Sequence, residues 1–125
     1  MAIIVKIHSG FGNQLFQYAA GRSLALRNQT DLLLDTWSFE TNTYRSYGLG
    51  HLNISAPGIS RRRLKWEMQL RRKTYRPLRW LLRGARSPLA NRYLLDAMGG
   101  YDARFDEPGR NLYLDGYWQS ERYFS

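Results

Sequence analysis

The 125-residue sequence contains no cysteine and only two histidines, His8 and His51. Disulfide bonds and thiolate metal sites are therefore excluded, and a metal centre built from several histidines is not expected. No apolar stretch approaches the roughly 20 residues that a transmembrane helix requires, and no basic segment followed by an apolar one marks a signal peptide. The cytoplasm is the expected compartment.

The residues that are present indicate one folded domain with an uneven charge. Hydrophobic residues make up 43% of the chain and aromatic residues 14%, as in a globular domain with a genuine core. The formal net charge is +9. Residues 61–92 hold twelve of the nineteen Lys and Arg residues and a single acidic residue, so this segment carries +11 and the remainder carries −2.

The basic segment 61–92 has three interpretations. Its charges would form the solvated faces of amphipathic helices, would contact an anionic membrane leaflet or acidic partner, or would bind nucleic acid beside Trp66, Tyr75 and Trp80. We expect solvated faces first, a peripheral contact with the inner face of the membrane second, and no nucleic-acid partner.

The first 35 residues have the pattern of a βαβ unit. A short, mostly β-branched run at 3–7 predicts a buried strand, and the spacing after it predicts a helix over 13–27. A second apolar run, 32–34, ends at Asp35. Two parallel strands joined by a right-handed helical crossover predict an α/β, Rossmann-like domain with helices on both faces of the sheet.

The rest of the chain has a weaker pattern. The elements expected there are loops with short extended pieces at 36–60, a helix at 61–73, a short helix from Pro77, a helical piece at 89–98, a strand at 111–115 and a helix that opens at Gln119.

The turn between the first strand and the first helix is the strongest candidate for a binding site. It reads Gly10-Phe11-Gly12-Asn13-Gln14. A helix N-terminus presents unpaired backbone N–H groups, and its dipole favours an anion there. The glycines allow a phosphate to approach closely, which makes a nucleotide diphosphate the natural ligand. The same residues also suit a plain tight turn with Asn13 as the helix cap.

The first helix is expected to turn one face to the core. Phe16, Ala20 and Leu24 follow helical spacing and are predicted to pack inward. Gln14 and Gln17 are then the polar positions left near the mouth of the turn.

Three further polar residues stand at the ends of expected strands. His8, Asp35 and Asp115 would share the carboxyl edge of a parallel sheet, where open α/β sheets bind ligands. His8 either faces a ligand or satisfies the turn, and Asp115 suits a cap or turn better than catalysis. A dinucleotide site is the alternative interpretation, in which Asp35 would bind a ribose. Leu15, however, occupies the position of the third glycine in the dinucleotide-binding fingerprint, so its side chain would keep the helix and the strand apart.

Three blocks of the sequence carry a family resemblance. They are HSGFGNQLFQYAAG at 8–21, Leu34-Asp35 followed by YRSYGLGHLNI at 44–54, and YLDGYWQSERYF at 113–124. The pattern G-[FL]-G-N-Q-[LM]-F-Q-Y-A in the first block is quite specific, and together the blocks span nearly the whole chain. The chain resembles the bacterial α-1,2-fucosyltransferase family.

The resemblance implies an inverting, metal-independent transfer of L-fucose from GDP-fucose to the 2-hydroxyl of a galactose-containing glycan, with no cofactor. It implies that 1–125 form the N-terminal α/β domain of a two-domain, GT-B-like glycosyltransferase. Arginine and helix N-termini would stabilise the departing diphosphate. No catalytic residue is assigned, and the residues implied at the GDP-fucose site are Gly10, Phe11, Gly12, Asn13 and Gln14, with His8 beside them.

One family motif is missing from the sequence. The H-x-R-R-x-D motif, which carries the chief arginine for the nucleotide in a C-terminal domain, does not occur. We therefore expect one wall of a GDP-fucose site, and an isolated chain that transfers fucose poorly or not at all. Two other classes stay open: a truncated Rossmann-type dinucleotide-binding domain, and a basic, non-enzymatic interaction module built on 61–92.

Overall fold

A sheet of four parallel strands forms the centre of the computed structural model, which describes residues 2–54, 56–75, 92–95, 100–107 and 109–125. The strand order is β2-β1-β4-β3. The strands are β1 (Ala2–Lys6), β2 (Asp31–Asp35), β3 (Arg92–Leu95) and β4 (Leu112–Asp115). The α/β class expected from the sequence is confirmed, and the sheet is compatible with part of a Rossmann-like domain.

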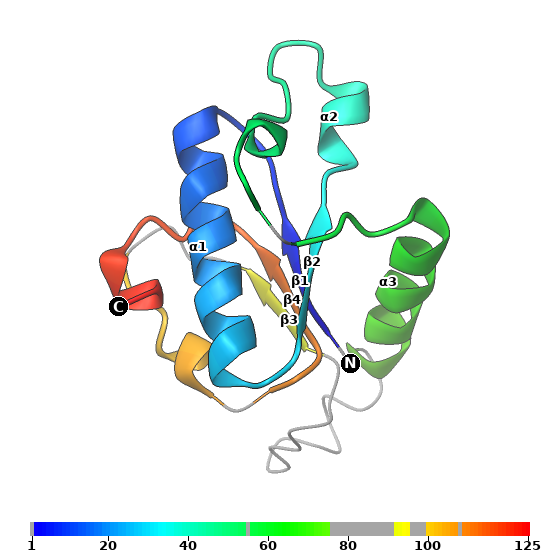
Figure 1. Ribbon diagram of the computed structural model, residues 1–125. Helices are drawn as coiled ribbons and strands as arrows, with labels where there is room; N and C mark the ends of the chain where they lie inside the picture. The colour runs from blue at the N-terminus through cyan, green and yellow to red at the C-terminus, as the bar shows by residue number, and fades with distance from the viewer. Residues whose placement is uncertain (1, 55, 76–91, 96–99, 108) are drawn as a thin grey trace.

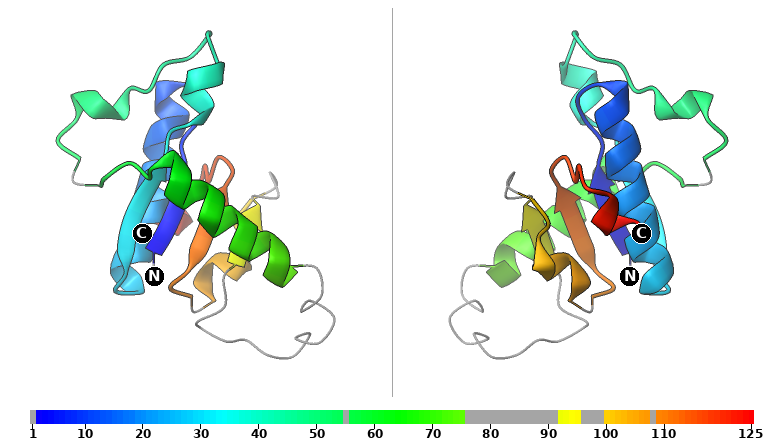
Figure 2. Two further views of the ribbon diagram at one scale, coloured as in Figure 1. Left: turned by 90° about the vertical axis from the view of Figure 1, so that its right-hand side faces the viewer. Right: turned by 90° about the vertical axis from the view of Figure 1, so that its left-hand side faces the viewer.

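Helices cover both faces of the sheet, as expected. α1 (Phe11–Arg27) lies on one face together with the short 3-10 helix η3, and α3 (Arg61–Tyr75) lies on the other (Figures 1 and 2). None of the helices in the described residues has the length and apolar character needed to cross a membrane. The remaining short elements are α2 (Ser38–Thr41), η1 (Leu49–His51), η2 (Ala103–Asp106) and η3 (Glu121–Tyr123).

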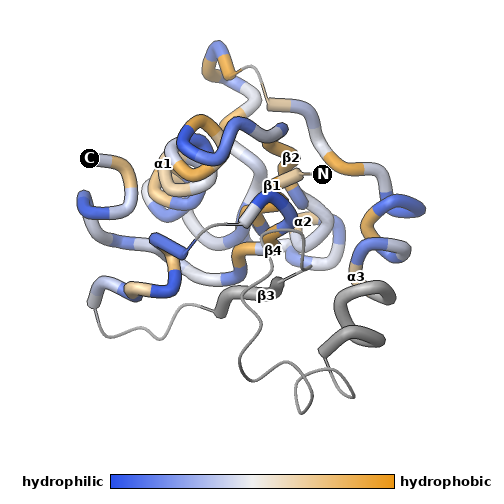
Figure 3. Tube along the Cα trace, turned by 90° about the horizontal axis from the view of Figure 1, so that it is seen from below, coloured by the Kyte–Doolittle hydropathy of each residue, from blue (hydrophilic) through white to orange (hydrophobic). Residues whose placement is uncertain are grey.

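The apolar run of β1 is explained by burial on both faces. Successive residues of a strand point to opposite sides, so Ile3 and Val5 join the core beneath α1, whereas Ile4 joins a second core beneath α3. Leu64 and Met68 of α3 pack against that second core. Seen from below, the hydrophobic residues of the strands lie between the two helices (Figure 3).

The outer edge of β2 is covered by an extended segment. The backbone N–H of Leu34 donates to the carbonyl of Pro57 at 3.0 Å, and the N–H of Ile59 donates to the carbonyl of Leu34 at 2.8 Å. This pairing satisfies the outward-facing backbone groups of Leu34, which an edge strand otherwise leaves unpaired.

The prediction of a helical piece at 89–98 is wrong where the structure describes it. Residues 92–95 form β3, which pairs in parallel with β4 from Arg92 opposite Leu112 to Leu95 opposite Asp115. A four-residue run has little helical stability of its own, and the ladder with β4 decides its conformation.

Other boundaries also differ from the sequence prediction. The region 36–60 contains the short helices α2 and η1 in addition to loops, and the helix expected from Gln119 is only the 3-10 turn η3. The helix at 61–73 is confirmed as α3. The short helix expected from Pro77 lies outside the described residues.

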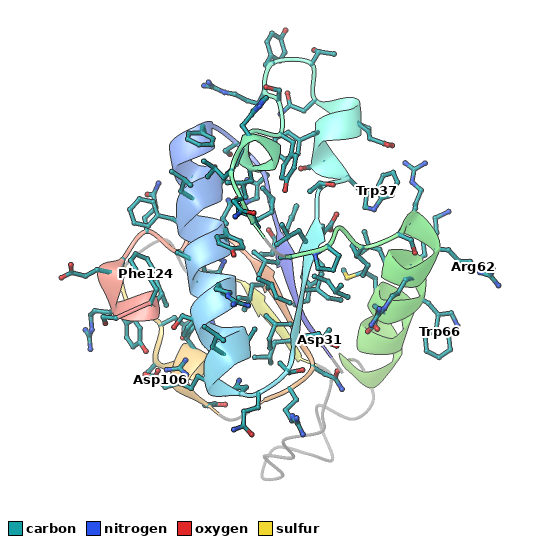
Figure 4. The ribbon with its side chains drawn as sticks, viewed as in Figure 1. Asp31, Trp37, Arg62, Trp66, Asp106 and Phe124 are labelled. Atoms are coloured by element: carbon teal, nitrogen blue, oxygen red, sulfur yellow. The ribbon has the colours of Figure 1, made fainter. Side chains whose placement is uncertain are left out.

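The buried face of α1 is confirmed at Ala20 and Leu24, but the prediction for Phe16 is wrong. Phe16 is 37% exposed, and its ring lies 6.0 Å from that of Phe124, which sits beside α1 (Figure 4). Beside Ala20 and Leu24, the helix buries four positions that were not predicted to be core: Gln14, Gln17, Gly21 and Ala25. The helix rolls onto this side because Gly21 lets it approach the sheet, where a Cβ would lie only 2.2 Å from Cγ2 of Val5.

Candidate functional site

The carboxyl ends of β1 and β4, two neighbouring strands at the centre of the sheet, define the candidate site. β1 continues through His8 to Gly10 into α1, and β4 continues through 116–119 toward η3. In Figure 1 this edge is at the top, where α1 begins. Open α/β sheets bind ligands outside the carboxyl ends of their strands, where connections leave in different directions. We call residues 8–14 the glycine turn and residues 116–119 the β4 exit.

The glycine turn presents the start of α1 without any capping side chain. Ser9 adopts a left-handed conformation with φ 68°, and Gly10 is the N-cap with φ −72° and ψ 165°. The alternative of Asn13 as the cap is therefore wrong. In the described part of the chain, the N–H groups of Phe11, Gly12 and Asn13 have no hydrogen-bond partner, and the first turn of α1 contains no acidic residue. The end of a 17-residue helix is thus open to an anion.

Arg45 adds a positive charge to the same place. Its Nη1 lies 3.9 Å from the position of a Cβ built on Gly10. The side chain is exposed, and no carboxylate among the described residues pairs with it. The ring of Phe11 lies against Gly48, where a Cβ would be 2.6 Å from Cδ2 of Phe11. This contact holds residues 44–48, which we call the segment of Arg45, next to the glycine turn.

Arg45 was not among the residues predicted for the site. It lies in the YRSYG part of the second block of the resemblance, which is the signal that would have found it. Nothing in the local sequence, however, indicates that this loop folds back over a turn more than 30 residues earlier in the chain.

Gln14 supports the glycine turn from inside. Its side chain is fully buried, and its Nε2 donates to the carbonyls of Ser9 and Ser46, each at 3.0 Å. Its Oε1 accepts from the N–H of Gly48 at 2.9 Å. The amide therefore joins the turn to the segment of Arg45, and its buried position keeps it from direct contact with a ligand.

Gln17 joins the two sides of the site in the same way. It is also fully buried. Its Oε1 accepts from the backbone N–H of His8 at 3.0 Å, and its Nε2 donates to the carbonyl of Gly116 at 3.1 Å. The expectation that Gln14 and Gln17 lie at the mouth of the turn is corrected: both are internal ties, because buried backbone groups require partners.

Asn13 is the amide that faces outward. Its Oδ1 accepts a hydrogen bond from Nε2 of Gln119, so it links the start of α1 to the β4 exit. Asn13 is partly buried and Gln119 is exposed, which leaves Asn13 at the surface of the site.

His8 lies beside the β4 exit. Its Nδ1 is 3.1 Å from Oγ of Ser9, and its ring meets that of Tyr117 edge-on at 5.1 Å. Burial and then the positive charge of Lys6 lower the pKa of His8 from 6.5, against the opposing effect of Asp115 and the Gly116 carbonyl. His8 is therefore neutral at pH 7 and adds no charge to the site.

Asp115 reaches the carboxyl edge as expected, but Asp35 has a structural role. Asp115 Oδ2 pairs with Nζ of Lys6 at 3.3 Å, next to His8. The buried Asp35 instead accepts from the hydroxyl of Tyr113 at 2.6 Å and from the N–H of Trp37 at 3.1 Å. A carboxylate enclosed in this way is not open to a ribose.

The prediction that Leu15 keeps α1 away from the sheet is wrong. Leu15 is 38% exposed and does not separate α1 from the sheet. The close approach occurs at Gly21, further along the helix. It is the enclosure of Asp35, not the side chain of Leu15, that counts against a dinucleotide.

The chemistry open to this site is anion binding by backbone N–H groups, Asn13 and Arg45. Within the described residues, no three His, Asp or Glu side chains are grouped so that they could hold a metal ion. Comparison with known proteins found no matching family model, no matching curated protein and no matching solved structure.

Proposed function

We propose that the glycine turn binds the diphosphate of GDP-fucose, and that the chain is the N-terminal, GT-B-like domain of an α-1,2-fucosyltransferase acting on a galactose-containing glycan. The observation that carries the proposal is the coincidence of three unpaired N–H groups at the start of α1 with the guanidinium of Arg45. The three blocks that resemble the family support a sugar nucleotide as the source of the diphosphate.

The energetics favour a group with more than one negative charge. A helix N-terminus stabilises an anion by about 0.3–1 kcal/mol when exposed. A hydrogen bond to a charged group contributes about 1.5–3 kcal/mol, so Arg45 is expected to supply the larger share. In a transfer reaction the same groups would stabilise the charge that develops on the departing diphosphate.

The internal glutamines give the proposed site its rigidity. Gln14 ties the turn to the segment of Arg45, and Gln17 ties it to the β4 exit. Groups held before the ligand arrives lose little entropy on binding. We therefore assign Gln14 a positioning role, whereas Gly10, Phe11, Gly12 and Asn13 keep their proposed contact with GDP-fucose.

A titration followed by NMR tests the proposal on the full chain. GDP-fucose is added to 15N-labelled protein, with GDP, pyrophosphate and NAD as comparison ligands. The largest shifts are expected at the backbone amides of residues 10–13. Arg45→Ala is expected to weaken binding of GDP-fucose roughly ten- to hundredfold, the equivalent of one charge-assisted hydrogen bond.

Arg22→Ala is the matched control, since Arg22 is an exposed arginine further along α1 with no ion-pair partner in the described structure. It should leave the affinity unchanged. Shifts centred elsewhere, equal effects of the two substitutions, or tighter binding of NAD than of GDP-fucose would each refute the proposal.

Fucose transfer by the isolated chain is a separate question. A radiolabelled assay with GDP-fucose and a galactoside is expected to show little or no product. Clear turnover would show that this chain supplies the catalytic groups by itself, contrary to the expectation from the missing H-x-R-R-x-D motif.

A further inference from the structure

The outer face of α3 carries an exposed indole next to two cations. Trp66 is 64% exposed, and Arg62 is exposed on the same side of the helix one turn earlier. Lys65, the residue before Trp66, is exposed on the neighbouring part of the helix surface. Arg62 and Trp66 extend away from the sheet (Figure 4). We call Arg62, Lys65 and Trp66 the Trp66 patch.

The patch is not needed to hold α3 on the sheet. Leu64 and Met68, on the opposite side of the helix, make the contact with the core. Trp66 is not among the residues that pack against this core, so its indole is available for a contact outside the domain.

The cations of the patch are also unpaired, unlike their neighbours. Arg61 lies 3.7 Å from the carboxylate of Glu40 and stacks over the ring of Trp37, and Arg63 lies 3.8 Å from Glu67. In the part of the chain that the structure describes, Arg62 and Lys65 have no such carboxylate.

The sequence after the patch is also rich in cations. Arg71, Arg72 and Lys73 follow within α3. The segment 61–92 as a whole carries +11. The patch therefore lies within the most positive part of the chain.

We propose that the Trp66 patch docks this chain on an anionic membrane surface. Tryptophan prefers the interface between water and lipid, where its ring is buried and its N–H stays hydrated. Basic side chains beside it are attracted to anionic headgroups. The apolar side of α3 is already used by the sheet, so the contact is a shallow one with a single inserted indole.

A nucleic acid is the less suitable partner for this surface. Single strands bind where successive bases stack on several aromatic rings along a groove, whereas the described part of α3 offers one indole on a convex helix. The inference is independent of the proposed function, because α3 and α1 lie on opposite faces of the sheet (Figure 2).

Vesicle co-sedimentation with the full chain tests the proposal. Vesicles of phosphatidylcholine alone are compared with vesicles that also contain phosphatidylglycerol. The protein is expected to bind the anionic vesicles only. Arg62→Glu is expected to weaken that binding roughly tenfold, because it replaces attraction by repulsion at one position. Trp66→Ala is expected to weaken it to a similar extent and to abolish the blue shift of tryptophan fluorescence caused by vesicles.

Two control variants match these changes in kind. Arg22→Glu alters the net charge equally on the other face of the sheet, and Leu26→Ala removes an apolar side chain that is 61% exposed on α1. Both should leave vesicle binding unchanged, and circular dichroism checks that all four variants fold. Equal binding to uncharged vesicles, equal loss with the controls, or unchanged vesicle affinity of Trp66→Ala would overturn the proposal. Binding of an oligonucleotide but not of vesicles would overturn it as well.

Discussion

Replacing Gln17 by leucine would separate the two sides of the candidate site while keeping nearly the same side-chain volume. In the native protein the Gln17 amide accepts from the N–H of His8 and donates to the carbonyl of Gly116. Leucine can do neither. The substitution therefore leaves one backbone donor and one backbone acceptor near the start of α1 without their partner.

The size of the effect follows from these two groups. A buried polar group that loses its partner costs about 1–3 kcal/mol. Because both groups are near the edge of the sheet, where water can partly replace the amide, we expect a loss of about 2–4 kcal/mol in the free energy of unfolding. This is a large fraction of the roughly 5–15 kcal/mol that stabilises a typical domain.

Urea unfolding followed by circular dichroism measures the loss. Gln119→Leu is the control, since Gln119 is an exposed glutamine at the β4 exit whose amide bonds only to Asn13 among the described residues. It should change the free energy of unfolding by less than about 0.5 kcal/mol. If Gln17→Leu proved as mild as this control, the view of Gln17 as an internal tie would be refuted.

Two further substitutions test the protonation of His8 and the packing of α1 on the sheet. Burial and Lys6 lower the pKa of His8 from 6.5, so the unfolded chain binds a proton at this residue more readily than the folded protein does. The free energy of unfolding is therefore unaffected by His8 above about pH 6.5 and falls as the pH drops below that value. His8→Gln should therefore lose less stability than the native protein between about pH 7.5 and about pH 5.5 in urea titrations, and an equal loss would contradict the assignment. Gly21→Ala would place a Cβ 2.2 Å from Cγ2 of Val5 and should lower the free energy of unfolding by about 1–3 kcal/mol. Gly12→Ala, with nothing within 4 Å of the added atom, should not destabilise the protein, and a loss equal to that of Gly21→Ala would argue against a close contact at the sheet.

The βαβ unit at the start of the chain was predictable because its signals are local. The run of β1 is apolar at every buried position, and the residues around Asn28 end the helix within the sequence itself. The parallel orientation of β1 and β2 was predictable because the connection between them is long enough to contain a helix. These features need no knowledge of distant residues.

The parts that the sequence did not predict depend on distant partners. Gln14 and Gln17 resemble surface residues until Gly48 and Gly116 are placed beside them. β3 is fixed by its pairing with β4, and the segment of Arg45 is fixed by its contact with the glycine turn. A polar residue in a helix is predicted to be exposed when its hydrogen-bond partners lie tens of residues away, because the local sequence gives no sign of them.

The central place of β1 in the sheet has a consequence for how the protein is made. Ile3 pairs with Leu112, so β1 leaves the ribosome before a partner strand that is synthesised more than 100 residues later. At about 5–20 residues per second, β1 spends roughly 5–20 s with one side unpaired. During that time the nascent βαβ unit exposes an open strand edge of apolar residues, which is the state most prone to aggregation. The rate of synthesis is therefore expected to affect the yield of folded protein.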